Sequence, residues 1–263
     1  MSVAFLWLAC SFYLYLQDHP VHCSDTITIT GEMSAETFVA VRDCLVRFKA
    51  EKKTFVAEDS TGGDAYTALA IAILIRRHNW DVEVDGVCAS SCANWIFPAG
   101  RMKYLNSQSM LLFHGGPHQK NMLEFAEKID QQFAANGAPV DSVELGRKRR
   151  EGTLKWSPTM SAATAEVLEF LSIKKDLPAA EKWRQFTTAS DRFYQESGID
   201  PLLPEYGQRG GYEPLYESDK YGGFIYRLDS LRRLGIRNIE LKDGEWHPER
   251  HPIYPAVYEV TFP

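Results

Sequence analysis

The sequence predicts an α/β fold with a parallel sheet, and three observations lead to this class. Strand-like and helix-like segments alternate from residue 26 to residue 117, as they do when parallel strands are joined by helices. The helix expected over residues 65–78 is apolar on nearly every face, which is typical of a buried helix. Two of the strand-to-helix turns consist of small residues, Gly62-Gly63 and Ser90-Ser91.

Each element of this region follows from a local pattern. Residues 26–30, Thr-Ile-Thr-Ile-Thr, alternate strictly and end at Gly31, which predicts a strand. Ser34 is a good helix cap, and the apolar residues after it lie on one face of an amphipathic helix. The other expected elements are strands at 54–57, 82–84 and 110–113, a turn at 59–64, and a buried helix from the Ser90-Ser91 segment to Gly100.

From about residue 120 the pattern changes to helices and a Pro- and Gly-rich stretch. Helices are expected at 122–135, 162–173 and 228–234, the Pro- and Gly-rich stretch at 198–223, and strands at 239–241 and 257–262. We therefore expect three parts: a signal peptide or membrane anchor (1–23), an α/β core (24–118), and a helical elaboration (119–263) whose C-terminal segment returns to the core.

Composition bounds the function only loosely. The chain has 263 residues, 44% hydrophobic and 24% charged, as expected for a globular protein with a full core. The formal net charge of −6 gives no support to a nucleic-acid partner. The basic run 147–150 is read as a solvated face.

The N-terminus indicates export. Residues 3–16 are almost wholly apolar, and about fourteen residues suit a secretory signal better than a membrane span. No Lys or Arg precedes the stretch, and no clean cleavage site follows it. A retained membrane anchor and a buried first element of the fold are the alternatives. We expect a periplasmic or secreted protein, anchored to the membrane if the segment is retained.

The five cysteines are too few for a disulfide scaffold. Cys88 and Cys92 lie four positions apart, so either a bridge or two buried thiols fits the spacing. No further ligands stand nearby at metal spacing. The histidines of His247-Pro248-Glu249-Arg250-His251 are spaced like those of a zinc helix, but Pro248 lies inside the motif. No metal or cofactor is expected.

Two strand-to-helix turns and one strand end carry the candidate chemistry. A turn that opens a helix exposes backbone N–H groups that favour an oxyanion. Gly63 offers one such N–H, and Ser91 adds a hydroxyl beside the N–H of Cys92. His114 follows an apolar strand and is flanked by glycines. Each feature alone has a structural explanation, as a plain turn, a helix cap or a structural histidine, so the joint order carries the argument.

That order resembles the proteolytic subunit of Clp protease and exported bacterial proteins of the Clp/crotonase superfamily. The matching segments are Ile29-Thr30-Gly31, Ser60-Thr61-Gly62-Gly63, Ala89-Ser90-Ser91 nine residues before the Gly of Ala99-Gly100, and Leu112-Phe113-His114. The resemblance covers residues 26–117, and Thr61 replaces the family's proline. It implies a spiral of β-β-α units with the helical C-terminal elaboration added.

The resemblance also assigns roles. Ser91 is the nucleophile, His114 the general base, and the N–H groups of Gly63 and Cys92 the oxyanion hole. The third member of the triad precedes a helix that ends like Leu231-Arg232-Arg233-Leu234-Gly235. Asp219 is the first candidate for it and Asp229 the second.

The leading hypothesis is therefore a serine peptidase that acts through an acyl-enzyme, without ATP, on peptides or unfolded proteins. Family resemblance also implies homo-oligomers. The alternatives are a non-catalytic binding or scaffolding protein that keeps the fold, and a Ser–Lys peptidase in which Lys103 is the base.

Overall fold

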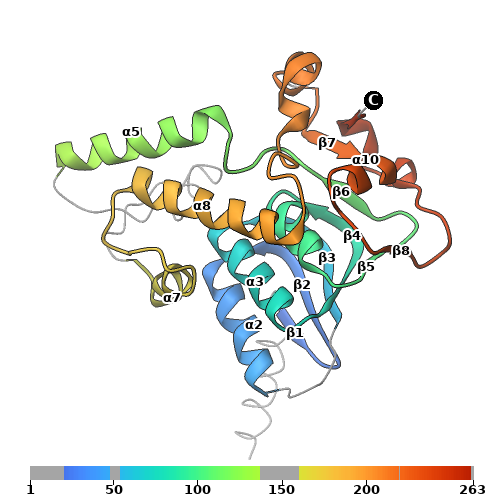
Figure 1. Cartoon of the computed structure of the whole chain (residues 1–263), viewed down its shortest axis with the longest axis horizontal. Coiled ribbons are helices and arrows are strands. Elements are labelled where there is room, and N and C mark those ends of the chain that lie inside the picture. The colour runs from blue at the N-terminus through green and yellow to red at the C-terminus, as the bar shows by residue number, and fades with distance from the viewer. Residues whose placement is uncertain (1–20, 48–53, 137–159, 219, 262–263) are drawn as a thin grey trace, which may run out of the picture.

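The computed structural model describes residues 21–47, 54–136, 160–218 and 220–261. A seven-stranded sheet forms the centre, with strand order β1-β2-β3-β4-β5-β8 and with β6 also paired to β4 (Figure 1). All pairs are parallel except β1 with β2. The strands are β1 Val21–Cys23, β2 Thr26–Met33, β3 Thr54–Gly63, β4 Asp81–Ala89, β5 Lys103–Leu105, β6 Met110–Leu112 and β8 Ile239–Leu241. The α/β class predicted from the sequence is confirmed.

The core strands are longer than their patterns predicted. β2 continues past Gly31, which has φ +66°, and β3 continues to Gly63 through a register shift between Glu58 and Ser60. A bulge of this kind re-aims the end of a strand without ending the pairing. The alternating pattern marks only the regular part, so the predicted strands stopped where the bulges begin.

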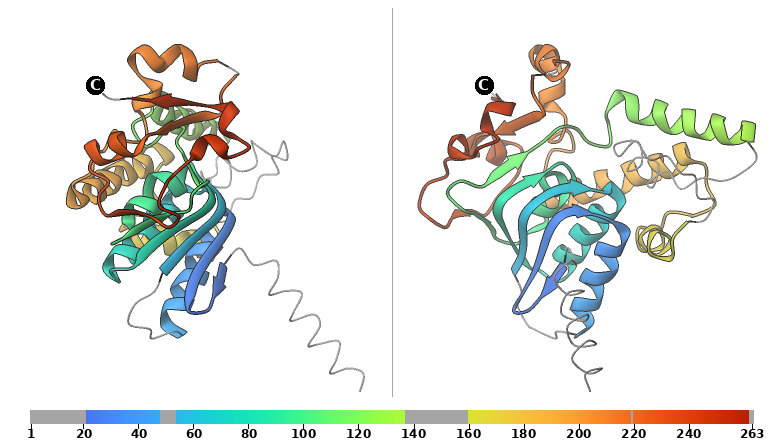
Figure 2. Two further views of the ribbon diagram at one scale, coloured as in Figure 1. Left: turned by 90° about the vertical axis from the view of Figure 1, so that its right-hand side faces the viewer. Right: turned by 180° about the vertical axis from the view of Figure 1, so that it is seen from behind.

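Helices connect these strands and cover the sheet (Figures 1 and 2). α2 (Ala35–Arg47) and α3 (Ala65–Arg77) pack against each other, and α3 is buried along most of its length, as predicted. The Ser34 hydroxyl donates to Glu36 instead of accepting from the helix. After β4 the chain forms a π-helical turn, η1 (Cys92–Ile96), and the short α4 (Phe97–Ala99).

The second half wraps around this core. The helices are α5 Lys120–Asn136, α7 Ala162–Phe170, α8 Ala179–Ser197, α9 Glu213–Tyr216 and α10 Leu228–Arg233, with short 3-10 turns η2 Tyr206–Gln208, η3 Gly210–Tyr212, η4 Pro248–Arg250 and η5 Tyr254–Ala256. β7 (Gly223–Tyr226) and β9 (Val257–Val260) form a separate parallel pair. β8 joins the central sheet beside β5, so the C-terminal segment returns to the core.

α8 is the longest of the described elements that the local patterns missed; the short β1, β5, β7 and α9 were missed too. α8 lies beside α3 and η1, where Phe186 is fully buried and its ring contacts those of Tyr66 and Trp95. Trp95 donates to the Ser190 hydroxyl at 2.9 Å, and Tyr194 donates to the Asn94 carbonyl at 2.7 Å. These contacts fix the helix that follows β4 from its outer side. α5, in contrast, projects away from the sheet beside α8 (Figure 1).

Candidate functional site

The Gly62-Gly63 turn brings the end of β3 against the end of β4. Both glycines have positive φ, +88° and +128°. A Cβ added to Gly62 would lie 2.5 Å from the Ala89 carbonyl oxygen and 2.9 Å from the Ser91 nitrogen. Glycine is therefore required at this position, because any side chain would separate the two strand ends. Asp64 then caps α3 by accepting from the Thr67 N–H at 2.7 Å.

Ser91 stands at the beginning of the helix that follows β4. Ser90 turns the chain with φ +56°, and its N–H donates to the Leu112 carbonyl at 2.8 Å. Ser91 is only 2% exposed, and its hydroxyl donates to the Gly63 carbonyl at 3.2 Å. The two predicted turns therefore meet, and in this conformation the carbonyl of Gly63 is the group that Ser91 contacts.

A disulfide spans the Ser91 turn. Cys88, at the end of β4, is bonded to Cys92, the first residue of η1, with 5.3 Å between the Cα atoms. Both cysteines are fully buried. The choice left open by the sequence is thereby decided for a bridge. The Cys92 N–H lies in the first turn of a helix, where backbone donors lack partners within the helix.

His114 leaves the sheet beside Ser91. Ala89 of β4 is the register partner of Leu112 of β6, so Ser91 and His114 each lie two residues beyond a paired position. The Asn94 side chain donates to the Gly115 carbonyl at 2.8 Å, which ties the helix of Ser91 to the residue after His114. His114 is exposed. The structure thus brings these two predicted residues to the same carboxyl edge of the sheet, where open α/β sheets bind ligands.

Two side-chain amides hold the backbone at His114. Gln208 donates to the His114 carbonyl at 2.7 Å and Gln119 at 3.3 Å. Gln119 also donates to the Tyr216 hydroxyl at 3.1 Å, and burial raises the pKa of Tyr216. No local pattern marks these residues, because their role depends on the second half of the chain folding back over the loop.

The candidates for the third triad member have different outcomes. Asp219 lies outside the described residues. Asp229 lies in the first turn of α10, its side chain is 88% exposed and it pairs with Arg232 at 3.3 Å, so it faces solvent. The segment that follows Asp219 does reach the site: Phe224 forms an antiparallel bridge with Phe113, and a Cβ added to Gly223 would lie 3.3 Å from the Cβ of His114.

A second histidine and two carboxylates near the site were not predicted. His118 Nε2 lies 2.7 Å from Asp191 Oδ1 of α8, and the His118 N–H donates to Glu205 at 2.6 Å. The Glu205 side chain is 1% exposed and pairs with Arg209 at 2.6 Å. Burial raises its pKa despite that partner. These contacts join residues up to 87 positions apart, a separation that leaves no sequence signal.

Lys103 does not reach Ser91. Its ammonium donates to the Gly100 carbonyl at 2.6 Å and to the Arg237 carbonyl at 3.1 Å. Gly100 caps the far end of the helix that Ser91 begins. Desolvation lowers the pKa of Lys103 to about 8, and the nearby Arg76 acts in the same direction. The Ser–Lys alternative is therefore not supported by this geometry.

The described parts of the chain offer neither a metal centre nor a membrane span. Within them, no cluster of three or more His, Cys, Asp or Glu side chains could hold a metal ion. His247 instead lies 2.8 Å from both Glu245 and Glu249. None of the described helices has both the length and the hydropathy to span a bilayer. A disulfide that the sequence did not predict joins Cys23 of β1 to Cys44 of α2.

Comparison with known proteins gives a similarity to solved structures. No protein-family model matches the sequence, and no curated protein does either. Among solved structures, a point mutant of ClpP1 from Listeria monocytogenes is similar to this chain, with 14% sequence identity and a TM-score of 0.44. The match covers 84% of this chain and 94% of that one. At these values the similarity carries no information about the activity of this protein.

Proposed function

We propose that this protein is a serine hydrolase, and specifically a peptidase, with Ser91 as nucleophile and His114 as general base. One observation carries the proposal: Ser91 and His114 follow adjacent, paired strands in matching register, with Ala89 opposite Leu112. Neighbouring strands lie about 4.8 Å apart, so the two residues leave the sheet from adjacent positions. The Gly62-Gly63 turn lies against the same point.

The reaction follows from these groups. His114 accepts the proton of the Ser91 hydroxyl as Oγ bonds to the peptide carbonyl carbon. The Gly63 and Cys92 N–H groups stabilise the resulting oxyanion. His114 then gives the proton to the leaving amine, an ester to Ser91 remains, and water cleaves it by the reverse sequence. Asp219 would orient His114, since the chain four residues later contacts it.

Activation needs one change at Ser91. Its hydroxyl donates to the Gly63 carbonyl at 3.2 Å, so it must exchange this acceptor for the imidazole before it attacks. We propose that this exchange is a side-chain rotation, because Ser91 begins a helix already fixed by a disulfide and by Asn94. Substrate binding at the edge of the sheet supplies a reason for the exchange. The substrate carbonyl in the oxyanion site competes with the Ser91 hydroxyl for the space beside Gly63.

The test is labelling with a fluorophosphonate probe, which phosphonylates activated serines. The wild-type protein is expected to be labelled, Ser91→Ala to be unlabelled, and Ser90→Ala to retain labelling. Ser90 is the matched control because it adjoins Ser91 in the same turn. Labelling that persists in Ser91→Ala and disappears in Ser90→Ala would transfer the role to Ser90.

We propose further that the protein works outside the cytoplasm. Two disulfides, Cys23–Cys44 and Cys88–Cys92, support this because such bonds persist in oxidising compartments. No ATP is available there to drive an unfolding partner, so peptides and unfolded chains are the proposed substrates, and the apolar N-terminal segment is proposed to direct export or anchoring. Thiol alkylation in denaturant without reductant tests the disulfides, because Cys44, Cys88 and Cys92 are buried in the native protein. Modification of Cys23, Cys44, Cys88 or Cys92 under these conditions contradicts the bridges.

The alternative is a non-catalytic binding protein that has kept the fold. It is favoured by the 2% exposure of Ser91 and by the hydroxyl's bond to Gly63. A wild-type protein that resists the probe while remaining folded would establish this alternative. Homo-oligomerisation stays a prediction, tested by the mass of the native particle in solution.

A further inference from the structure

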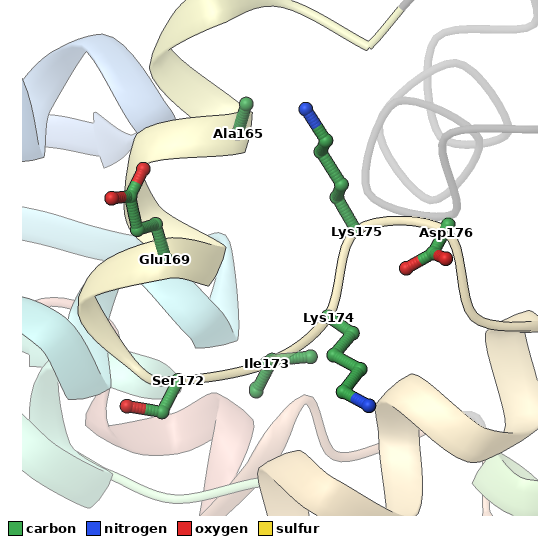
Figure 3. A pocket seen from close by; sticks show the side chains of 7 residues that line it. All are labelled: Ala165, Glu169, Ser172, Ile173, Lys174, Lys175 and Asp176. Atoms are coloured by element: carbon green, nitrogen blue, oxygen red, sulfur yellow. The ribbon is translucent and has the colours of Figure 1, made fainter.

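Two hollows flank the loop between α7 and α8, and their charges differ. The first, of about 430 Å³, is lined by that loop and by α7. In Figure 3 the side chains of Lys174 and Lys175 point to opposite sides of the loop. Its two lysines are balanced by Glu169 and Asp176. Charge therefore gives no reason to assign a ligand to this first hollow.

The second hollow, of about 420 Å³, is lined by α3, α8 and the end of α7. Three arginines, Arg76, Arg77 and Arg192, contribute to its wall together with one carboxylate, Glu196. This local excess of positive charge stands out in a chain with a formal net charge of −6. The volume lies within the roughly 300–1,000 Å³ usual for small-molecule sites.

The arginines are presented in fixed orientations. The Arg77 guanidinium lies over the Phe170 ring, 4.9 Å from its centre, and the Arg76 guanidinium lies 5.2 Å from the centre of Phe193. Arg76 also donates to the Phe193 carbonyl at 3.0 Å. A guanidinium stacked on a ring keeps its edge N–H groups available, and its planar fork matches a carboxylate or phosphate.

The existing ion pairing leaves most of this charge unneutralised. Arg76 approaches Glu196 at 3.8 Å, but the Glu196 side chain is 61% exposed, and exposed pairs at this distance contribute little. Among the described residues, no carboxylate forms an ion pair with Arg77 or Arg192. The rest of the wall consists of Ser172 and five apolar residues, Ile73, Phe170, Leu171, Ala189 and Phe193.

We propose that this second hollow binds a small organic anion, a carboxylate or phosphate carried on an apolar or aromatic body. The arginines at the end of α3 and on α8 receive the anionic group, and the half-buried Ile73, Phe170 and Ala189 contact the apolar part.

The site is separate from Ser91. Ser91 contacts Gly63, next to the N-cap of α3 at Asp64, whereas Arg76 lies near the other end of that helix. Twelve residues separate Asp64 from Arg76, which is about 18 Å along a helix. The site is therefore independent of the proposed hydrolase activity.

The test is direct binding to the full protein, measured by calorimetry at low ionic strength with three probes. N-acetylphenylalanine carries the carboxylate, its amide is the neutral match, and phenyl phosphate carries the other anion. Saturable binding of either acid, with the amide at least tenfold weaker, is expected, and the order of the two acids shows which anion the site prefers. Absence of binding by both acids, or equal binding of the amide, overturns the proposal.

A pair of double variants locates the binding. Arg77→Gln with Arg192→Gln should weaken the preferred acid at least tenfold. Arg184→Gln with Arg232→Gln removes the same charge from exposed helix positions that already pair with carboxylates, and should change the affinity less than twofold. Circular dichroism verifies that both are folded. An equal loss in the two double variants would reduce the effect to general electrostatics and refute the site.

Discussion

The α/β core and the second half of this protein contribute to the candidate site in different ways. The core holds the proposed reactive groups: Gly62-Gly63 ends β3, and Ser91 and His114 follow β4 and β6. The second half supplies the support. α8 packs on the outer side of the Ser91 helix through Phe186, and Gln208 and Gly223 lie against the backbone at His114.

The difference teaches that reactive groups and their supports follow different rules. Pairing between β4 and β6 fixes where Ser91 and His114 leave the sheet, so a few residues at the ends of these strands define their positions. Support comes from separate contacts between distant segments, each made by a large buried side chain or a single hydrogen bond. Changes in the core should therefore act on activity, whereas changes in the second half should act first on stability.

The largest effect is expected from His114→Gln. Loss of the general base should reduce the rate of fluorophosphonate labelling by about 10²–10⁴-fold, while the melting temperature changes little because His114 is exposed. His118→Gln is the matched control, a histidine four residues along the same loop. If His118→Gln abolishes labelling and His114→Gln does not, the base has been assigned to the wrong histidine.

Phe186→Ala tests the support. Phe186 is fully buried and contacts the rings of Tyr66, Trp95 and Trp183, so its truncation should lower the free energy of unfolding by about 3–5 kcal/mol. Phe125→Ala on the projecting α5 should cost less, because Phe125 is only partly buried. Chemical denaturation measures both. Equal losses would mean that α8 is no more tightly joined to the core than α5.

Burial of Lys103 in the core makes the free energy of unfolding depend on pH. Its pKa is lowered to about 8 by burial from an ordinary value of 10.5, so the unfolded chain binds more protons than the native one between these values. Stability should therefore rise with pH through that window, by at most about 3 kcal/mol. Denaturation of wild type and Lys103→Met from pH 7.5 to 9.5 measures the slope. An unchanged slope in the variant rules Lys103 out as its source.

The smallest effect is expected from Tyr194→Phe. It removes a buried hydroxyl that donates to the Asn94 carbonyl at 2.7 Å, and leaves that carbonyl without this donor, at a cost of about 1–3 kcal/mol. Tyr212→Phe, whose hydroxyl bonds an exposed site at Thr261, is the control and should be nearly neutral. A fall in labelling rate beyond the change in stability would show that α8 also positions Ser91.

The sequence by itself determined the α/β class, most of the core elements and the placement of Ser91 and His114 at the same carboxyl edge of the sheet. Its information there is local: alternation for strands, apolar faces for helices, and small residues at Gly62-Gly63 and Ser90-Ser91 where strands give way to helices. Even the Cys88–Cys92 bridge was within reach as one of two alternatives, because its partners lie four residues apart.

Only the tertiary structure decided the rest. The Cys23–Cys44 bridge, the placement of α8, the His118–Asp191 contact and the arginine-lined hollow all join segments far apart in the chain. Such contacts depend on the directions in which folded elements approach one another, and a period of two or 3.6 residues holds no record of those directions. The order of strands and helices in the core can be read from one chain, but the packing of a distant helix cannot.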